Sequence, residues 1–327
     1  MSISLIGNGS SGIHMKSWRN RYPIYIPSKG RFERALTPAL LDRIGADYYV
    51  IVEPLEFDEY AKHLPDPSRI LVLPMEFKTD YDTAWPADWF DRFPNNTRNP
   101  GSGPARVFAG QHARANKTAK HWVMDDNIRH LKIRWGQQRW YARSPLPFRM
   151  IEDWSDQWIN LGMSGPHYAM FIPDRRRQVR PITYNTRIYS CNLINHECPC
   201  EWRGQYNEDT ILSIDMLKAG WGTALFNHLL IDKLKTGAMR GGNTDTIYTL
   251  GTEAKSELLR SVHPDVTRVG ERFGRTHHYV NYKAFTGVQL HRKPGYPPLP
   301  DYNLTLVSIN EAGDDAIEPV DSLSAGK

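Results

Sequence analysis

Residues 22–74 contain three short apolar runs, Tyr22-Pro-Ile-Tyr-Ile-Pro27, Tyr48-Tyr-Val-Ile-Val-Glu53 and Arg69-Ile-Leu-Val-Leu-Pro74. Their length and apolar character are typical of buried strands. Residues 36–44 and 56–63, which lie between the runs, have the pattern of helices. Short apolar strands that alternate with helices predict a mainly parallel sheet.

The rest of the chain continues this alternation. A helical pattern over residues 106–120 leads into a fourth apolar run, His121-Trp-Val-Met-Asp125, and a helix over 207–220 precedes a strand over 223–231. Further segments predict helices at 151–161 and 252–262, an extended pair within 184–194, and a late strand or helix at 276–285. We therefore predict an α/β protein with a Rossmann-like, mainly parallel central sheet flanked by helices.

The amino-acid composition is typical of a folded protein. The chain has 327 residues, of which 40% are hydrophobic, with 10 Trp and 16 Tyr, and this content argues against disorder. No apolar run approaches 18 residues, which excludes a membrane span, and residues 1–12 lack a secretory signal pattern. Three cysteines argue against a disulfide scaffold, so we expect a cytoplasmic protein.

Charge is distributed unevenly along the chain. The net charge is +5, but the last 17 residues hold five acids and one base, so the first 310 residues carry +9. A basic body with an acidic tail favours a polyanionic partner. No feature indicates an obligate protein partner.

The chain is expected to form one large domain with additions. We expect a flexible tail at residues 1–18, a domain at 19–293, and a linker with an acidic tail at 294–327. Within the domain, residues of about 75–104 and 129–182 are expected to be insertions that contact the acceptor, because a long loop in a compact domain is usually functional.

Two acidic residues, Asp125 and Asp126, directly follow the fourth predicted strand. In open α/β sheets, ligands bind at the carboxyl ends of the strands. Paired carboxylates at that edge suit Mg²⁺ or Mn²⁺ on a diphosphate. The alternative interpretation is an ordinary polar turn after a strand.

A second acidic pair, Glu208-Asp209, opens the predicted helix at 207–220. A carboxylate held at a rigid helix start suits a general base, for which Asp209 is our first candidate and Glu208 the second. The alternative is a structural role, because the helix dipole favours acids in the first turn.

Together these features resemble the GT-A fold of nucleotide-sugar glycosyltransferases. The phrases Ile26-Pro-Ser-Lys-Gly-Arg31, Val123-Met-Asp-Asp-Asn-Ile128, Asn207-Glu-Asp-Thr210 and Met239-Arg-Gly-Gly-Asn243 are similar to the TET-associated glycosyltransferases, a branch of that fold encoded largely by bacteriophages. The resemblance implies transfer of a sugar from a nucleotide-sugar, such as a UDP-sugar, to a 5-hydroxymethylpyrimidine such as 5-hydroxymethylcytosine in phage DNA.

The resemblance also assigns roles to residues of the first half. The first turn and second strand would bind the donor nucleotide, through Pro27, Ser28, Lys29, Arg31 and Glu53. Asp126 would hold Mn²⁺ or Mg²⁺, with Asp125 as a second ligand or a contact to the sugar or ribose.

Other residues are candidates for the diphosphate and the metal. Lys29, Arg31 and Arg106 would stabilise the departing charge, and Arg240, Gly241 and Gly242 would close over the diphosphate. A late histidine would complete the metal site, and His228, His277 and His278 are the candidates, although a histidine in an apolar strand is more often a core residue.

A basic and aromatic stretch follows the acid pair. Cations for phosphate and flat rings for an unpaired base are what strand binding requires. The predicted nucleic-acid residues are Arg134, Trp135, Arg139, Trp140, Arg143, Arg175, Arg176 and Arg177, and Trp85, Trp89 and Phe90 are candidates for holding a flipped base. The alternative is a solvated basic face over core aromatics.

Two further functions remain open on the sequence. One is the same enzyme class with a glycan, lipid or protein acceptor. The other is a non-catalytic DNA-binding protein on a degenerate GT-A scaffold, in which the acid pair would be dispensable.

Overall fold

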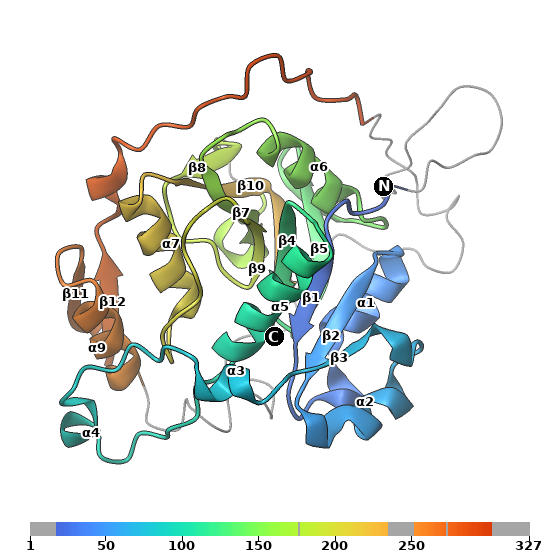
Figure 1. Ribbon diagram of the computed structural model, residues 1–327. Coiled ribbons are helices and arrows are strands. Elements are labelled where there is room, and N and C mark those ends of the chain that lie inside the picture. Colours follow the sequence, from blue (N-terminus) through green and yellow to red (C-terminus); the bar gives the residue numbers. More distant parts are fainter. Residues whose placement is uncertain (1–17, 176, 235–251, 273, 303–327) are drawn as a thin grey trace, which may run out of the picture.

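The computed structural model describes residues 18–175, 177–234, 252–272 and 274–302 (Figure 1). The strands predicted from the three opening runs are confirmed, as are the helices between them. Four strands form the parallel part of the sheet in the order β3-β2-β1-β4. These strands are β1 (Ile24–Pro27), β2 (Tyr48–Val52), β3 (Ile70–Val72) and β4 (Lys120–Met124).

The sheet continues past β4 with strands of both directions. Its order is β4-β9-β7-β10-β5-β6, where β9 runs antiparallel to β4 and β7, and β10 runs parallel to β7. A short strand, β8, pairs with β10. The bounds are β5 (Ile128–Trp135), β6 (Gln138–Tyr141), β7 (Leu161–Tyr168), β8 (Ile182–Tyr184), β9 (Cys191–Asn195) and β10 (Gly222–Lys233).

The interpretation of residues 129–182 as an insertion is wrong for most of that stretch. It supplies β5, β6 and β7, and β7 lies in the sheet between β9 and β10. The glycine and proline residues of β7, Gly162, Gly165 and Pro166, hid the strand from pattern analysis. Gly165 is required there because a Cβ would lie 2.1 Å from the Cys191 carbonyl oxygen of β9.

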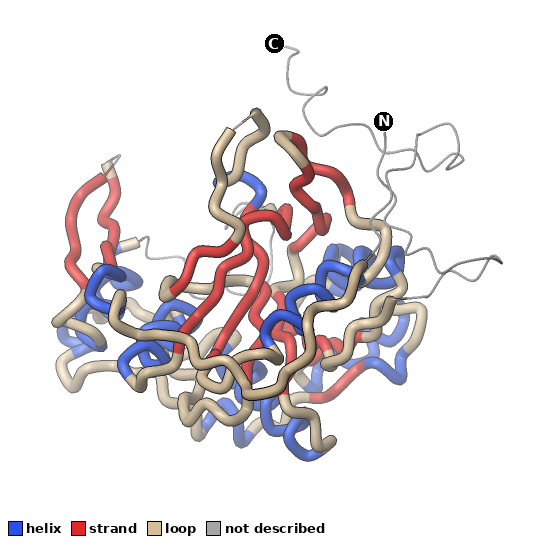
Figure 2. Tube along the Cα trace, turned by 90° about the horizontal axis from the view of Figure 1, so that it is seen from above, coloured by secondary structure: helices blue, strands red, loops and turns tan. Residues whose placement is uncertain are grey.

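Helices cover both faces of the sheet (Figures 1 and 2). One core cluster joins β1, β2 and β5 to α1, α2 and α6, and the other joins β1 and β4 to α5 and α7. The α/β prediction is therefore confirmed. The helices are α1 (Leu36–Ile44), α2 (Phe57–His63), α3 (Glu76–Thr79), α4 (Trp89–Arg92), α5 (Gly103–Ala115), α6 (Leu146–Ser155), α7 (Glu208–Lys218) and α9 (Glu253–Val262).

Two details differ from the sequence predictions. Helix α6 begins at Leu146 rather than at residue 151, because Pro147 is acceptable in a first helical turn. The late segment forms a hairpin of β11 (Thr267–Arg272) and β12 (Arg275–Val280), which packs on α9 and extends from the body at the left of Figure 2. No described helix is long and apolar enough to cross a membrane.

Candidate active site

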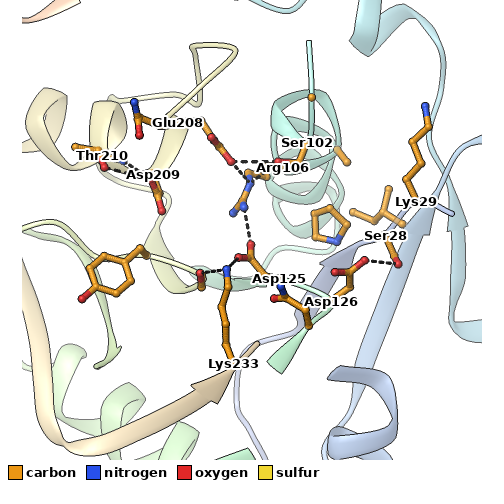
Figure 3. Close-up of a pocket in the computed structure, with 18 of the residues that line it drawn as sticks. Ser28, Lys29, Ser102, Arg106, Asp125, Asp126, Glu208, Asp209, Thr210 and Lys233 are labelled. Atoms are coloured by element: carbon orange, nitrogen blue, oxygen red, sulfur yellow. Dashed lines mark hydrogen bonds and ion pairs between the residues drawn. The ribbon is translucent and has the colours of Figure 1, made fainter. Parts of the chain in front are cut away.

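The carboxyl ends of the sheet strands border a pocket of about 370 Å³. Ser28 follows β1 and Asp125 follows β4, while Tyr168 ends β7 and Lys233 ends β10; all four line the pocket. Figure 3 shows the turn after β1 on one side, the start of α7 on the other, and the end of β4 between them. The sheet therefore gathers polar side chains at the edge where α/β proteins bind ligands.

The turn after β1 is fixed to the acid pair. The Ser28 hydroxyl donates to Asp126 Oδ2 at 2.8 Å and lies 2.6 Å from the Tyr60 hydroxyl. The Arg31 guanidinium donates to Asp126 Oδ1. Burial raises the pKa of Asp126, and Arg31 and Ser28 offset only part of that rise. Pro27, Ser28, Lys29 and Arg31 all line the pocket, as the donor-site prediction requires.

Glu53, which directly follows β2, is paired with two lysines. It accepts from Lys29 Nζ at 2.7 Å and from Lys78 Nζ at 2.8 Å. Burial raises the pKa of Glu53, but the two ammonium groups outweigh burial and lower it below its ordinary value. Glu53 is therefore an anionic hydrogen-bond acceptor on the pocket wall at neutral pH.

The backbone of the acid pair is held by Thr37, in the first turn of α1. Thr37 is fully buried. Its hydroxyl donates to the Asp125 carbonyl oxygen at 2.5 Å and accepts from the Ile128 amide at 2.9 Å, while its own amide donates to the Asp126 carbonyl oxygen at 3.1 Å. Thr37 of α1 thus fixes the backbone of Asp125 and Asp126, and with it the orientation of their side chains.

Arg106, on α5, joins the two acidic motifs. Its Nη2 donates to Asp125 Oδ1 at 2.8 Å, and its Nε lies 3.3 Å from Glu208 Oε1. The side chain is 5% exposed, and within the described residues its buried Nη1 has no hydrogen-bond partner. A buried guanidinium donor without a partner on a pocket wall is suited to an anionic ligand.

Lys233 occupies the remaining oxygen of Asp125. Its Nζ lies 2.5 Å from Asp125 Oδ2 and donates to Ser190 Oγ at 2.8 Å. Burial raises the pKa of Asp125, but Lys233 and Arg106 outweigh burial and hold it well below the ordinary range. Burial lowers the pKa of Lys233, but Asp125 outweighs burial and raises it, so both groups stay charged.

The start of α7 presents its two acids differently. Asn207, with φ +55°, turns the chain into the helix in a left-handed conformation that Asn tolerates. Glu208 is buried and accepts from Ser102 Oγ at 3.1 Å, and burial raises its pKa against the effect of Arg106. Asp209 is half-buried; its Oδ1 accepts from the Thr210 amide at 2.7 Å, and within the described residues its Oδ2 accepts no hydrogen bond. Asp209 is therefore the more accessible of the two carboxylates.

The residues present do not fit a divalent cation as they stand. Each of the four carboxylate oxygens of Asp125 and Asp126 already accepts from a protein donor. Among the described residues, no three His, Cys, Asp or Glu side chains form a group that could hold a metal ion. Of the three histidine candidates, His228 lies in the middle of β10 and does not line the pocket, whereas His278 of β12 does.

None of the predicted nucleic-acid residues that the structure describes lines the pocket. Arg139 is bound to Asp174 through two hydrogen bonds of 3.0 and 3.1 Å and donates to the Ala169 carbonyl oxygen at 2.9 Å. Arg134 is buried and Trp140 packs against the core. Trp135, Arg175 and Arg177 are exposed, and Arg143 is half-exposed. Arg176 lies outside the described residues.

The expectation that residues 85–90 hold a flipped base is wrong for the tryptophans. Trp89 is fully buried in a cluster with Tyr206 and Leu258, and Trp85 donates from Nε1 to Gln205 Oε1 at 3.0 Å and packs on Phe90. Residues 85–90 therefore pack against the loop that precedes α7. The predicted phosphate loop with Arg240, Gly241 and Gly242 lies outside the described residues.

Several pocket residues were missed by the sequence analysis. Lys233 had a usable signal, because it follows an apolar strand that ends at the ligand-binding edge. Tyr168 had none because β7 was not predicted. Ser190 lies inside the extended pair predicted at 184–194, but a single serine there does not indicate a ligand site. Ser102 and Thr37 act through contacts between distant elements, which a single sequence does not reveal.

The comparisons with known proteins agree with this geometry. A search of curated proteins gives no match. The sequence model of the TET-Associated Glycosyltransferase family matches residues 22–242, which span every strand that contributes to the central sheet and both acidic motifs of the pocket. The chain therefore belongs to the TET-Associated Glycosyltransferase family, and the protein is a glycosyltransferase.

Proposed function

We propose that the protein transfers a sugar from a nucleoside diphosphate sugar, a UDP-sugar, to the hydroxyl of 5-hydroxymethylcytosine or another hydroxymethylpyrimidine in phage DNA. The observation that carries this proposal is one pocket that combines a buried arginine donor without a described partner, Arg106 Nη1, with an accessible carboxylate, Asp209. The first suits a departing diphosphate and the second suits an attacking alcohol.

The donor nucleotide is assigned to the side of the pocket formed by β1 and β2. Lys29 and Glu53 lie at that wall, with Ser28 between them and the acid pair. A carboxylate beyond a strand end is suited to accept from ribose hydroxyls. The diphosphate would then lie toward Arg106, at the middle of the pocket in Figure 3.

The reaction needs a base because a primary alcohol is a weak nucleophile at neutral pH. In our proposal Asp209 accepts the hydroxymethyl proton while the oxygen attacks the anomeric carbon. The bond between that carbon and the diphosphate oxygen breaks, and its electron pair leaves with the diphosphate. Glu208 is less suited to be the base because it is buried and its Oε1 is shared by Arg106 and Ser102. A single displacement inverts the anomeric configuration.

The rim of the pocket supports a DNA acceptor. Phe171 lines the pocket and is 46% exposed, and the chain from Phe171 leads directly to the exposed Arg175 and Arg177. The Arg175 amide donates to the Gln137 carbonyl oxygen at 2.9 Å, which connects this segment to the turn that follows the exposed Trp135 at the end of β5. Cations beside an aromatic ring at the pocket suit a phosphate backbone and an unstacked base.

The proposal is tested by a donor and acceptor screen. The purified protein is incubated with a panel of nucleotide sugars and with DNA that contains cytosine, 5-hydroxymethylcytosine or 5-hydroxymethyluracil, and the digested nucleosides are analysed by mass spectrometry. We expect a glycosyl mass increase on a hydroxymethylated nucleoside only. Donor hydrolysis without any DNA adduct would instead indicate a non-DNA acceptor, and binding of DNA without hydrolysis would indicate a non-catalytic scaffold.

A further inference from the structure

Lys233 lies where it can contact both the acid pair and a ligand. It is the last residue of β10, and the pairing of β10 with β5 shifts register between Asp232 and Lys233. Such an irregularity re-aims the side chain at a strand end. The Lys233 side chain is 14% exposed and lines the pocket.

The hydrogen-bond capacity of Lys233 is not exhausted. An ammonium group has three N–H donors. Two are directed to Asp125 Oδ2 at 2.5 Å and Ser190 Oγ at 2.8 Å. Within the part of the chain that the structure describes, the third has no hydrogen-bond acceptor, so it can donate to a ligand oxygen in the pocket. Arg106, on the other oxygen of Asp125, likewise keeps a buried Nη1 without a partner in the described residues. Lys233 and Arg106 thus lie on either side of the Asp125 carboxylate, and each has an N–H group that can donate to a ligand.

These contacts leave the acid pair no site for a divalent ion. Asp125 is neutralised by Arg106 and Lys233, and Asp126 by Arg31 with Ser28. Removing Lys233 and Arg106 from Asp125 to admit a metal would break two buried ion pairs, and breaking buried pairs is strongly unfavourable.

We propose that Lys233, together with Arg106, supplies the positive charge that stabilises the departing diphosphate, so that sugar transfer by this protein needs no divalent cation. This inference rests on the proposed function. In the transfer step the electron pair of the broken bond goes to the diphosphate oxygen, which receives hydrogen bonds from the Lys233 ammonium. The proton of the attacking alcohol goes to Asp209, and Asp125 holds Lys233 in position.

The first test uses the wild-type protein alone. Transfer and UDP binding are measured in EDTA and again with Mg²⁺ or Mn²⁺. We expect both to be unchanged by the chelator. Transfer or UDP binding that is lost in EDTA and restored by Mn²⁺ would overturn the proposal.

The second test uses substitutions. Lys233→Ala should lower the transfer rate about 10²–10³-fold, as removal of one charge-stabilising donor does in other enzymes, and Lys233→Arg should recover part of that loss. Lys218→Ala, which breaks an exposed pair with Asp265 outside the pocket, is the matched control and should leave the rate unchanged. A wild-type rate for a folded Lys233→Ala variant would contradict the proposal.

A separate readout distinguishes this inference from the proposed function. UDP affinity is measured by calorimetry in EDTA, without any acceptor. If the wild type glycosylates no DNA yet binds UDP in EDTA more tightly than Lys233→Ala does, the acceptor proposal fails while the role of Lys233 stands. If the two proteins bind UDP equally, the role of Lys233 is rejected whatever the acceptor.

Discussion

Arg106 and Asp125 form a 2.8 Å ion pair in the pocket, and the same guanidinium reaches Glu208 at 3.3 Å. One side chain of α5 thereby connects the end of β4 to the start of α7. This pairing neutralises Glu208 and leaves Asp209 as the more accessible of the two acids at the start of α7. The position of Arg106 therefore explains why Glu208 is paired while Asp209 stays accessible.

Arg106→Ala should destabilise the protein. It leaves the buried Glu208 without its cation and Asp125 with Lys233 alone. Removing one partner of a buried pair costs about 3–5 kcal/mol. The free energy of unfolding in urea measures this. Arg114→Ala on the same helix is the control, because its pair with Glu201 is exposed and such pairs contribute about 0–1 kcal/mol. Equal losses for the two variants would contradict a central role for Arg106.

Asp209→Asn should abolish transfer while preserving the fold. The amide cannot accept the proton, and loss of a general base typically costs about 10²–10⁴ in rate. UDP affinity and the melting temperature should stay near the wild-type values. Asp215→Asn, on the same helix and paired with Arg203 at 2.8 Å, is the matched control and should retain transfer. A rate near wild type for Asp209→Asn would assign the base elsewhere.

The basic residues near the pocket should separate into two groups. Arg177→Ala removes an exposed cation and should weaken DNA binding, with the slope of log affinity against log salt falling by about one. Arg139→Ala instead breaks the paired bonds to Asp174 and should lower the unfolding free energy. Salt titrations of DNA affinity and denaturation curves measure the two effects. A specific loss of DNA affinity in a stable Arg139→Ala protein would reverse these assignments.

Glu152 should make stability depend on pH. It is fully buried under the Trp122 indole, from which it accepts at 2.9 Å, and burial raises its pKa to about 7. Because the folded pKa exceeds the unfolded value, the folded state binds the proton more tightly. The stabilising contribution is complete below about pH 4.5 and is lost as the pH rises through 7, at a total of about 3 kcal/mol.

The measurement is the difference in unfolding free energy between the wild type and Glu152→Gln at several pH values. Subtracting the variant cancels the groups that titrate in both proteins. The wild type should lose stability relative to the variant between pH 5 and pH 8. A difference that stays constant over that interval, or rises, would show that Glu152 is ionised throughout.

The sequence alone predicted those elements whose structure depends on a local pattern of residues. The strands before Ser28, Glu53 and Asp125 are continuous apolar runs, so their ends, and the pocket edge, were predictable. Strand β7 was not, because close packing against β9 demands Gly165 and removes the apolar signal.

The sequence predicted which acidic residues lie in the candidate site, but it did not predict which side chains they contact. Asp125 and Asp126 were found, but the cations that occupy their oxygens come from β10, α5 and the turn after β1. Likewise, Trp89 was a candidate for holding a flipped base, whereas contacts with Tyr206 and α9 bury it. Such pairings between distant elements depend on tertiary packing, which leaves no local pattern.

Glycosylation of a hydroxymethylated base in DNA is the reaction that we propose for this pocket. Its most direct test is a competition in one tube between two duplexes that differ only in carrying a single cytosine or a single 5-hydroxymethylcytosine, with the donor found in the screen. Mass spectrometry of both strands then follows the products. We expect a glycosyl adduct on the hydroxymethylated duplex alone, and no adduct with Asp209→Asn. Adducts on both duplexes, or on neither while the donor is consumed, would contradict it.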